Sequence, residues 1–173
     1  PDDVDNLTGT TDTKTLAEAK AYEGFTAPEV SQVNINGDES TIINLYYIRN
    51  SYTVSTIINN SKAGTINKTT SYKYEEEVTL TATTNEGYTF DGWYVGEYKL
   101  SSDLEYIYEV LSDVEITAKF IANTDTKYIV NHFKQNIDGT YNELPDDVDN
   151  LTGTTDTKTL ADVKTYDGFI AQE

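Results

Sequence analysis

Near the start of the chain, an acidic stretch places oxygen atoms at spacings that could hold a cation. Asp2, Asp3, Asp5 and Asn6 supply three carboxylates and one amide, and calcium is bound by such oxygen ligands. An EF-hand loop carries acidic or amide residues at three alternate positions, and Leu7 occupies the third of them. The spacing therefore favours a solvated loop, and a calcium site is the alternative.

This acidic stretch belongs to a segment that occurs twice. Seventeen residues, PDDVDNLTGTTDTKTLA, begin at Pro1 and again at Pro145, and the likeness extends over twenty-nine positions with six differences. The period is 145 − 1 = 144 residues, which indicates a tandem array whose units each hold one or two self-standing domains. The second candidate calcium site consists of Asp146, Asp147 and Asp149.

Residues for acid–base or nucleophilic catalysis are scarce. His132 is the single histidine and cysteine is absent, which excludes disulfides, thiolate metal sites and a cysteine nucleophile. His132 alternates with Tyr128 and Val130 in a predicted strand, as a packed strand residue would. A catalytic base would need a nucleophile and an orienting acid beside it. We expect no enzyme activity. We also expect no cofactor other than the calcium ion considered above.

Aromatic residues offer a second kind of binding site. The chain has fourteen tyrosines and one tryptophan, and aromatic rings can stack on sugars. In the motif EGYTFDGWYV we expect Tyr88, Phe90 and Trp93 to fill a small core, because the segment has few other large apolar side chains. Tyr94 and Tyr98 are the candidates for contact with a ligand.

Composition excludes several classes of partner. Thirty acidic and twelve basic residues give a net charge of −18, and such a surface repels phosphate backbones. We therefore expect the chain not to bind nucleic acid. No stretch is apolar enough for a membrane span, and no targeting signal is visible, so we expect no membrane insertion.

Strand signals dominate the chain. Apolar residues alternate with polar ones in EVTLTATT (77–84) and DVEITAKF (113–120), which predicts half-buried antiparallel strands. Further strands are expected at 42–48 and 104–111, and turns at Asn36-Gly37-Asp38, Ala63-Gly64 and Asp138-Gly139. Helix is limited to a marginal turn or two at 15–22 and 159–166.

These signals and the period predict four parts. Residues 1–49 form one piece, 51–121 a second, 122–126 (ANTDT) a polar linker, and 127–173 a third piece. We expect a mostly β fold of small antiparallel modules in tandem.

The middle piece resembles the divergent internalin B-repeat, also called the Listeria-Bacteroides repeat, over residues 52–120. The resemblance rests on AGTI (63–66), YKYEEEVTLTAT (72–83), EGYTFDGWYV (86–95) and VEITAKF (114–120). Where many relatives carry glycine before the E-V-T-L-T-A strand, this chain has Glu75-Glu76. The resemblance implies a β-grasp-like fold.

Residues 127–173 resemble the first part of a MucBP-type repeat of Gram-positive surface proteins, and residues 1–49 resemble its last part. KYIVNHFKQNIDGTY, the Gly-Thr-rich LTGTTDTKT and the motif YDGF carry the first likeness, and VNINGDESTIINLYYIRN carries the second. Surface modules of this kind sometimes carry lysine–asparagine isopeptide bonds, and Lys73 and Lys119 leave that possibility open.

Both resemblances imply a non-catalytic, extracellular repeat segment of a bacterial cell-surface or cell-wall protein, an adhesin stalk or spacer. The alternative is a module that binds mucin-type glycans or a host surface protein. Because the two MucBP-like pieces are complementary halves, each is expected to expose an unpaired strand edge. We expect the halves to complement each other, possibly head-to-tail between molecules.

Overall fold

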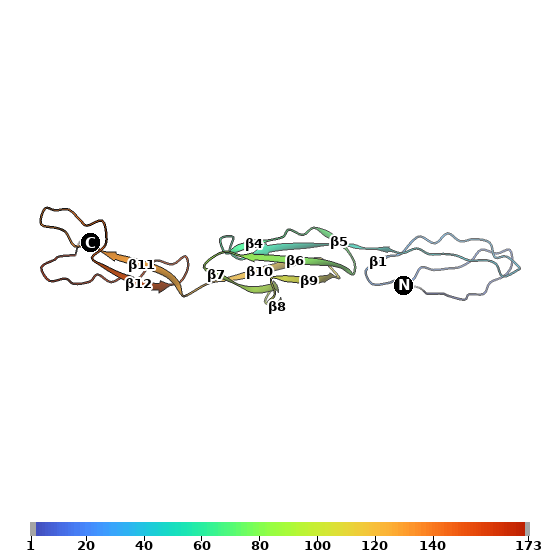
Figure 1. Cartoon of the computed structure of the whole chain (residues 1–173). Coiled ribbons are helices and arrows are strands. Elements are labelled where there is room, and N and C mark those ends of the chain that lie inside the picture. The colour runs from blue at the N-terminus through green and yellow to red at the C-terminus, as the bar shows by residue number, and fades with distance from the viewer. Residues whose placement is uncertain (1–2, 172–173) are drawn as a thin grey trace. The chain divides into compact units, whose positions relative to one another are not determined.

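The chain is built from strands. The structure is a computed structural model that describes residues 3–171, and in these residues it contains no helix, hence none that could span a membrane (Figure 1). This confirms the mostly β prediction. The strands are β1 (Phe25–Thr26), β2 (Ile48–Arg49), β3 (Ser51–Ile58), β4 (Gly64–Ile66), β5 (Ser71–Lys73), β6 (Glu76–Thr84), β7 (Tyr88–Val95), β8 (Tyr98–Ser101), β9 (Glu105–Val110), β10 (Val114–Ala122), β11 (Thr126–His132) and β12 (Asp147–Gly153).

Four sheets result. A five-stranded sheet has the order β5-β3-β10-β7-β8 and a three-stranded sheet the order β4-β6-β9, while β1-β2 and β11-β12 are two-stranded. Every strand pair whose register is resolved is antiparallel, as predicted. The β-grasp-like arrangement is not confirmed.

Alternating burial explains the central strands. In β6, Val78, Leu80 and Ala82 are buried and the threonines between them are exposed. In β10, Ile116 and Ala118 are fully buried. Each alternate side chain of a strand points to the same face, so one face of each strand removes apolar surface from water.

Contacts divide the chain into two compact units. The first consists of Pro1–Thr56, Asn67–Leu80 and Glu105–Ile116, and the second of Ile57–Ile66, Thr81–Leu104 and Thr117–Glu173. β3, β6 and β10 each run from one unit into the other. The first unit holds the β1–β2 and β3–β5 pairs, and the second holds the β4–β6, β7–β10, β7–β8 and β11–β12 pairs.

In the second unit, aromatic rings form the centre of packing. Trp93 is fully buried, and its indole Nε1 donates to the Asp103 carbonyl at 3.1 Å. The Phe90 ring lies edge-on to Trp93 at 5.5 Å and to Phe120 at 5.1 Å. Tyr88 is 9% exposed. The prediction that Tyr88, Phe90 and Trp93 fill the core is confirmed, with Phe90 half-buried.

Several local expectations are confirmed and one is wrong. Turns lie at the predicted Asn36-Gly37-Asp38 and Asp138-Gly139 sites, whereas the turn near Ala63 comes just before it and Gly64 begins β4. The strand predicted at 104–111 is confirmed as β9, Glu105–Val110. The strand predicted at 42–48 is wrong except at its end, because only Ile48 pairs, opposite Thr26. The short β1 offers no further partner, and Ile42 and Tyr46 remain 76% and 78% exposed.

The repeated segment has two different structures. Residues 3–9 and β12 share the sequence DVDNLTG. β12 pairs with β11 along its whole length, from Gly153 opposite Thr126 to Asp147 opposite His132, whereas residues 3–9 form no strand. Within residues 3–171 the β11 sequence TKYIVNH occurs once, and there it pairs with β12.

Replacing the buried indole tests this description of the core. We expect Trp93→Ala to lower the free energy of unfolding by about 3–5 kcal/mol, because it leaves a large cavity and an unpaired Asp103 carbonyl. Thermal unfolding followed by far-ultraviolet circular dichroism measures the change. Tyr98→Ala is the matched control: Tyr98 is 74% exposed, so its loss should change stability by no more than about 0.5 kcal/mol. Equal stability of the two variants would contradict the assigned core.

Candidate functional site

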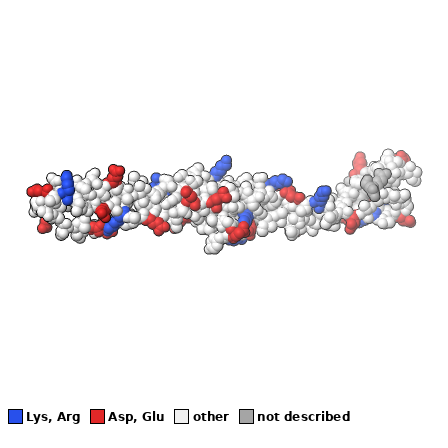
Figure 2. Space-filling view, turned by 180° about the vertical axis from the view of Figure 1, so that it is seen from behind, with Lys and Arg blue, Asp and Glu red and all other residues white. Residues whose placement is uncertain are grey.

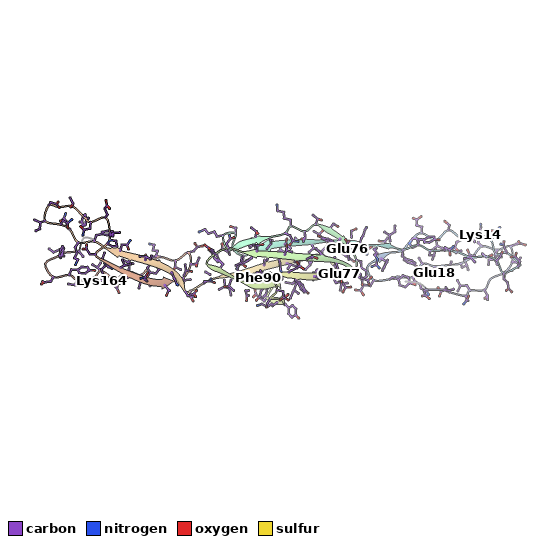
Figure 3. The ribbon with its side chains drawn as sticks, in the orientation of Figure 1. Lys14, Glu18, Glu76, Glu77, Phe90 and Lys164 are labelled. Carbon is purple, nitrogen blue, oxygen red and sulfur yellow. The ribbon has the colours of Figure 1, made fainter. Side chains whose placement is uncertain are left out.

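A cluster of polar side chains lies beside the β11–β12 hairpin, where Figure 3 shows Lys164. The Lys164 ammonium donates to Asp147 at 2.9 Å and to Asp149 at 2.5 Å. The Tyr166 hydroxyl donates to Asp147 at 3.1 Å, and His132 Nε2 lies 3.0 Å from Asp149. Asp147 and Asp149 are alternate residues of β12, so one lysine reaches both carboxylates.

The first unit contains the same cluster at positions 144 residues earlier. Lys20 donates to Asp3 at 2.7 Å and to Asp5 at 2.6 Å, and the Tyr22 hydroxyl donates to Asp3 at 3.2 Å. The arrangement thus forms whether or not the aspartates lie in a strand. We call each set of two aspartates, a lysine and a tyrosine a lysine–aspartate cluster.

Charge pairing sets the protonation states in these clusters. The hydrogen bond from Lys164 lowers the pKa of Asp147 to about 2, and Lys164 together with His132 lowers the pKa of Asp149. The same pairing raises the pKa of Lys164, as Asp3 and Asp5 raise that of Lys20. Burial and then the Asp147 hydrogen bond raise the pKa of the Tyr166 hydroxyl. The lysines are thereby kept charged, which makes them poor nucleophiles and poor bases.

These contacts bear on the candidate calcium ligands. Asp3, Asp5, Asp147 and Asp149 each face a lysine, and Asp146 accepts the Lys134 main-chain N–H at 2.6 Å. Asp2 lies outside the described residues. Within residues 3–171 no group of three acidic or histidine side chains is arranged to hold a metal. Calcium would have to displace an ammonium at either cluster, and calcium binding stays a prediction.

His132 lies on β11, where its side chain is 12% exposed. Its ring contacts Asp149 on one side and the Tyr166 ring edge-on at 6.1 Å. The histidine is therefore packed against the neighbouring strand, which agrees with its interpretation as a strand residue.

Tyr94 and Tyr98 differ in their availability to a ligand. The Tyr94 hydroxyl donates to Asp91 at 2.5 Å, and the ammonium groups of Lys99 and Lys119 lie 5.3 and 4.3 Å from its ring centre. Its hydroxyl is thus engaged and its ring is contacted by cations. Tyr98 lies on the edge strand β8 and is 74% exposed. Of the two predicted ligand-binding residues, Tyr98 is the accessible one.

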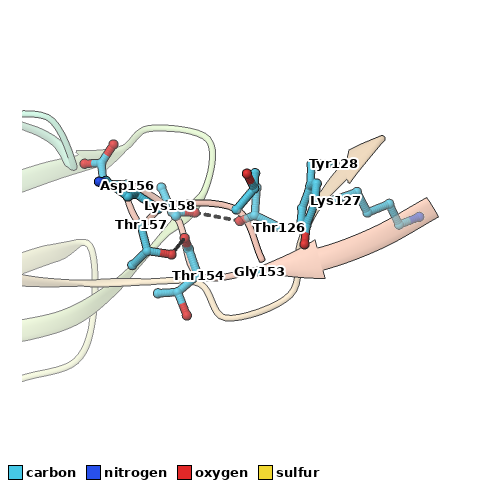
Figure 4. A pocket seen from close by; sticks show the side chains of 10 residues that line it. Thr126, Lys127, Tyr128, Gly153, Thr154, Asp156, Thr157 and Lys158 are labelled. Atoms are coloured by element: carbon cyan, nitrogen blue, oxygen red, sulfur yellow. Dashed lines mark hydrogen bonds between the residues drawn. The ribbon is translucent and has the colours of Figure 1, made fainter. Parts of the chain in front are cut away.

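A small hollow lies in the second unit, next to the start of β11 (Figure 4). Its volume is about 180 Å³, below the roughly 300–1,000 Å³ typical of small-molecule pockets. Threonine hydroxyls dominate its lining, and those of Thr126 and Thr155 share a 2.6 Å hydrogen bond. The Tyr128 hydroxyl donates to the Leu160 carbonyl at 2.9 Å. Its hydroxyl groups are largely bonded to one another or to main chain.

On the face that Figure 2 shows, aspartates and glutamates are spread among lysines over the surface. On this face the acidic side chains are therefore interspersed with basic ones.

Asn50, between β2 and β3, ties together segments on either side of it. Its N–H donates to the Gly24 carbonyl at 2.8 Å and its carbonyl accepts from Tyr74 N–H at 2.9 Å. Its side-chain oxygen accepts from the Thr26 hydroxyl at 2.6 Å. Asn50 therefore joins the β1 segment to the β5–β6 turn through three hydrogen bonds.

Aromatic and charged contacts reinforce this junction. Arg49 donates to the Tyr74 carbonyl at 2.8 Å, pairs with Glu75 at 2.5 Å and lies 5.1 Å above the Phe25 ring. The Phe25 and Tyr74 rings meet edge-on at 5.9 Å. Gly24 has φ of +73°, and a side chain there would collide with the Tyr74 ring. The chain's single arginine thus lies at a junction.

Asn123, in the predicted linker 122–126, makes the same set of contacts in the second unit. Its N–H donates to the Gly87 carbonyl at 2.8 Å and its carbonyl accepts from Thr155 N–H at 2.9 Å. Its side-chain oxygen accepts from the Thr89 hydroxyl at 2.7 Å. The Tyr88 hydroxyl donates to Asp156 close by. The linker is thus bonded to the start of β7 and to the turn that follows β12.

Neither junction was predicted. Asn50 and Asn123 look like ordinary polar linker residues, and main-chain hydrogen bonds leave no mark on the sequence. A usable signal was their position, since each directly follows one strand and precedes another by at most a few residues.

Removing one lysine tests the charge pairing. In Lys164→Met we expect the pKa of Asp147 to rise from about 2 to its usual value of 3.8 or above, because the ammonium is gone and Asp149 remains. A depressed carboxyl pKa stabilises the fold above the unfolded pKa, and this stabilisation is lost as pH falls towards 2. The variant should therefore lose less stability between pH 4 and pH 2.

Carboxyl-carbon NMR titration of Asp147 measures the shift, and unfolding at each pH measures the stability. Lys158→Met is the matched control, since Lys158 is exposed and near in sequence. An unchanged Asp147 pKa in Lys164→Met would disprove the pairing.

Comparison with known proteins finds a family likeness in the central part of the chain. Residues 52–124 match the family model of the divergent InlB B-repeat domain. No curated protein and no solved structure matches the chain. The matched residues run from β3 to β10 and end next to Asn123. They include all of residues 52–120, whose sequence resembles the same repeat. The likeness of residues 127–173 and 1–49 to a MucBP-type repeat stays a prediction.

Proposed function

We propose that the chain is a non-catalytic tandem-repeat segment of a bacterial cell-surface protein, in which bonded modules act as a stalk or spacer. The match to a divergent B-repeat domain over 52–124 supports a repeat module of a surface protein. The twenty-nine-residue repeat at a period of 144 supports an array. A family of this kind is generally non-enzymatic.

The observation that carries the spacer proposal is the pair of bonded junctions. A flexible linker leaves its main-chain groups to water, and the distance between its ends grows with the square root of its length. Asn50 and Asn123 instead bond their main-chain N–H and C=O to segments on either side. A short junction that is hydrogen-bonded in this way restricts the rotation of one module relative to the next. A spacer of defined reach requires such restriction.

The extracellular, wall-attached location belongs to the same proposal. It rests on the type of domain matched and on the Gram-positive character of the MucBP-type resemblance. Absence of cysteine agrees with an unprotected surface, where an exposed thiol would be oxidised.

Small-angle scattering of chains with one, two and three 144-residue units tests the spacer proposal. We expect the maximum dimension to rise in proportion to the number of units. In a control series, residues 123–125 are replaced by a twelve-residue Gly-Ser linker, and the dimension should then rise nearly with the square root. Identical growth in the two series would overturn the proposal.

A second candidate function is recognition of mucin-type glycans or of a host surface protein. Tyr98 favours it, because a 74% exposed tyrosine on an edge strand combines an aromatic face with unpaired main-chain groups. The clusters and the hollow favour it less, since their polar groups are already bonded.

A glycan array probed with the full chain tests this second function. If the chain binds, Tyr98→Ala should weaken binding about tenfold or more, as loss of a stacking anchor does. Tyr94→Phe is the matched control, because it keeps the ring and removes only the hydroxyl bonded to Asp91. Binding that survives Tyr98→Ala would remove Tyr98 from the site.

A further inference from the structure

β9 is the longest edge strand of the two central sheets, and it lacks the features that protect such an edge. It ends the three-stranded sheet and has six residues, whereas the other edges β4, β5 and β8 have three or four. β5 and β8 each contain a lysine, while β9 contains neither lysine nor proline. Short length, lysine and proline keep an edge from pairing with another chain. Among the edges of these two sheets, β9 is therefore the most open to an added strand.

Main-chain groups of alternate β9 residues point away from the sheet. The Val110 carbonyl accepts from the N–H of Glu75, directly before β6, at 2.7 Å. Residues of a strand bond alternately to the neighbour on one side and to the other side. The N–H and C=O groups of Glu105, Ile107 and Glu109 therefore face the open side of β9, where they are available to another strand.

The exposed side chains of β9 combine one apolar residue with two unpaired carboxylates. Glu105, Ile107 and Glu109 are exposed and alternate with half-buried tyrosines, and Ile107 is 56% exposed. Among residues 3–171, neither glutamate forms an ion pair. The carboxylates of the lysine–aspartate clusters are paired, so those of β9 differ in being available to a cationic partner.

The sequence of β9 and its flanks contains no cation. Residues 100–118 include five acidic residues and no lysine or arginine. Glu76 and Glu77, at the start of the neighbouring strand β6, add two further carboxylates (Figure 3). A surface of one charge sign attracts partners of the opposite sign, so a cationic segment is favoured at this edge.

The same charges oppose β9 of a second copy as the partner. Antiparallel pairing centred on Ile107 would place Glu105 opposite Glu109 of the other copy, and parallel pairing in register would place each glutamate opposite itself. Like charges directly opposite each other across two strands are destabilising. The partner strand must therefore have a different sequence.

We propose that β9 binds an extended cationic segment of another protein, which adds as a further strand of the three-stranded sheet. Strand addition supplies affinity through main-chain hydrogen bonds and specificity through alternate side chains. The residues opposite Glu105, Ile107 and Glu109 would be basic, apolar and basic, because opposite charges across two strands are stabilising. The recognised motif thus has two lysines or arginines four residues apart with an apolar residue midway. The inference depends neither on the spacer function nor on Tyr98.

NMR titration of the full chain with a synthetic peptide tests this edge. The probe is Thr-Lys-Thr-Ile-Thr-Lys-Thr. The control, Thr-Lys-Lys-Ile-Thr-Thr-Thr, has the same composition but directs one lysine to the opposite face of the strand. We expect the probe to cause saturable shifts of the amide signals of Glu105, Ile107 and Glu109, and the control to bind about threefold more weakly. Absence of saturable shifts, or equal affinity of the two peptides, would overturn the proposal.

Variants separate strand addition from simple charge attraction. Glu105→Gln combined with Glu109→Gln should weaken binding of the probe about five- to tenfold. Glu86→Gln combined with Glu97→Gln is the matched control, since it removes two exposed charges outside β9 and should change the affinity by less than about twofold. Ile107→Pro removes a main-chain N–H on the open side, and proline is tolerated at such a position of an edge strand, so it should abolish binding.

Each variant can contradict the proposal. Unchanged affinity in the Glu105 and Glu109 double variant, or in Ile107→Pro, would show that the probe binds elsewhere. Saturable shifts of the β9 amides when the chain is concentrated without peptide would show that a second copy occupies the edge, and would likewise overturn the proposal.

Discussion

Pairing of main-chain groups between strands is the constraint on which this structure depends. A strand alone leaves its N–H and C=O groups without partners in the protein, so an extended sequence becomes a strand only where a neighbour accepts it. The chain shows this with one sequence in two settings: DVDNLTG is a seven-residue strand beside β11 and no strand at residues 3–9. The same constraint limits β2 to Ile48 and Arg49, because β1 has only two residues to offer.

Contacts that do not need a second strand are the same in both copies. The Thr10 and Thr154 turns match, with Asp12 and Asp156 both at φ of +63°. The lysine–aspartate clusters also match, although one aspartate pair lies in a strand and the other does not. Local sequence therefore determines the turn and the charge pairing, and the partner strand determines pairing and burial.

This division explains how far the sequence predicts the structure. Alternation in β6 and β10 is a property of each strand alone, so their buried faces follow from Val78, Leu80 and Ile116 and their neighbours. How far a strand extends depends on the segment that pairs with it, and the sequence of 42–48 does not show that segment. The strand predicted over 42–48 was therefore too long, since only Ile48 has a partner. The contact of Lys164 with two aspartates joins residues 15 and 17 positions apart. It was missed because the aspartates alone resemble a calcium loop, although Lys20 and Lys164 recur at the same offset.

The two junctions are also held by main-chain hydrogen bonds. Electrostatic interactions are too weak to hold them in place of these bonds. With a charge of −18, neighbouring modules repel, but at physiological salt this repulsion is screened over about 8 Å. Exposed ion pairs such as Arg49–Glu75, with both side chains more than 40% exposed, contribute about 0–1 kcal/mol. The geometry at each junction must therefore come from the hydrogen bonds of Asn50 and Asn123 and from ring packing at Tyr74.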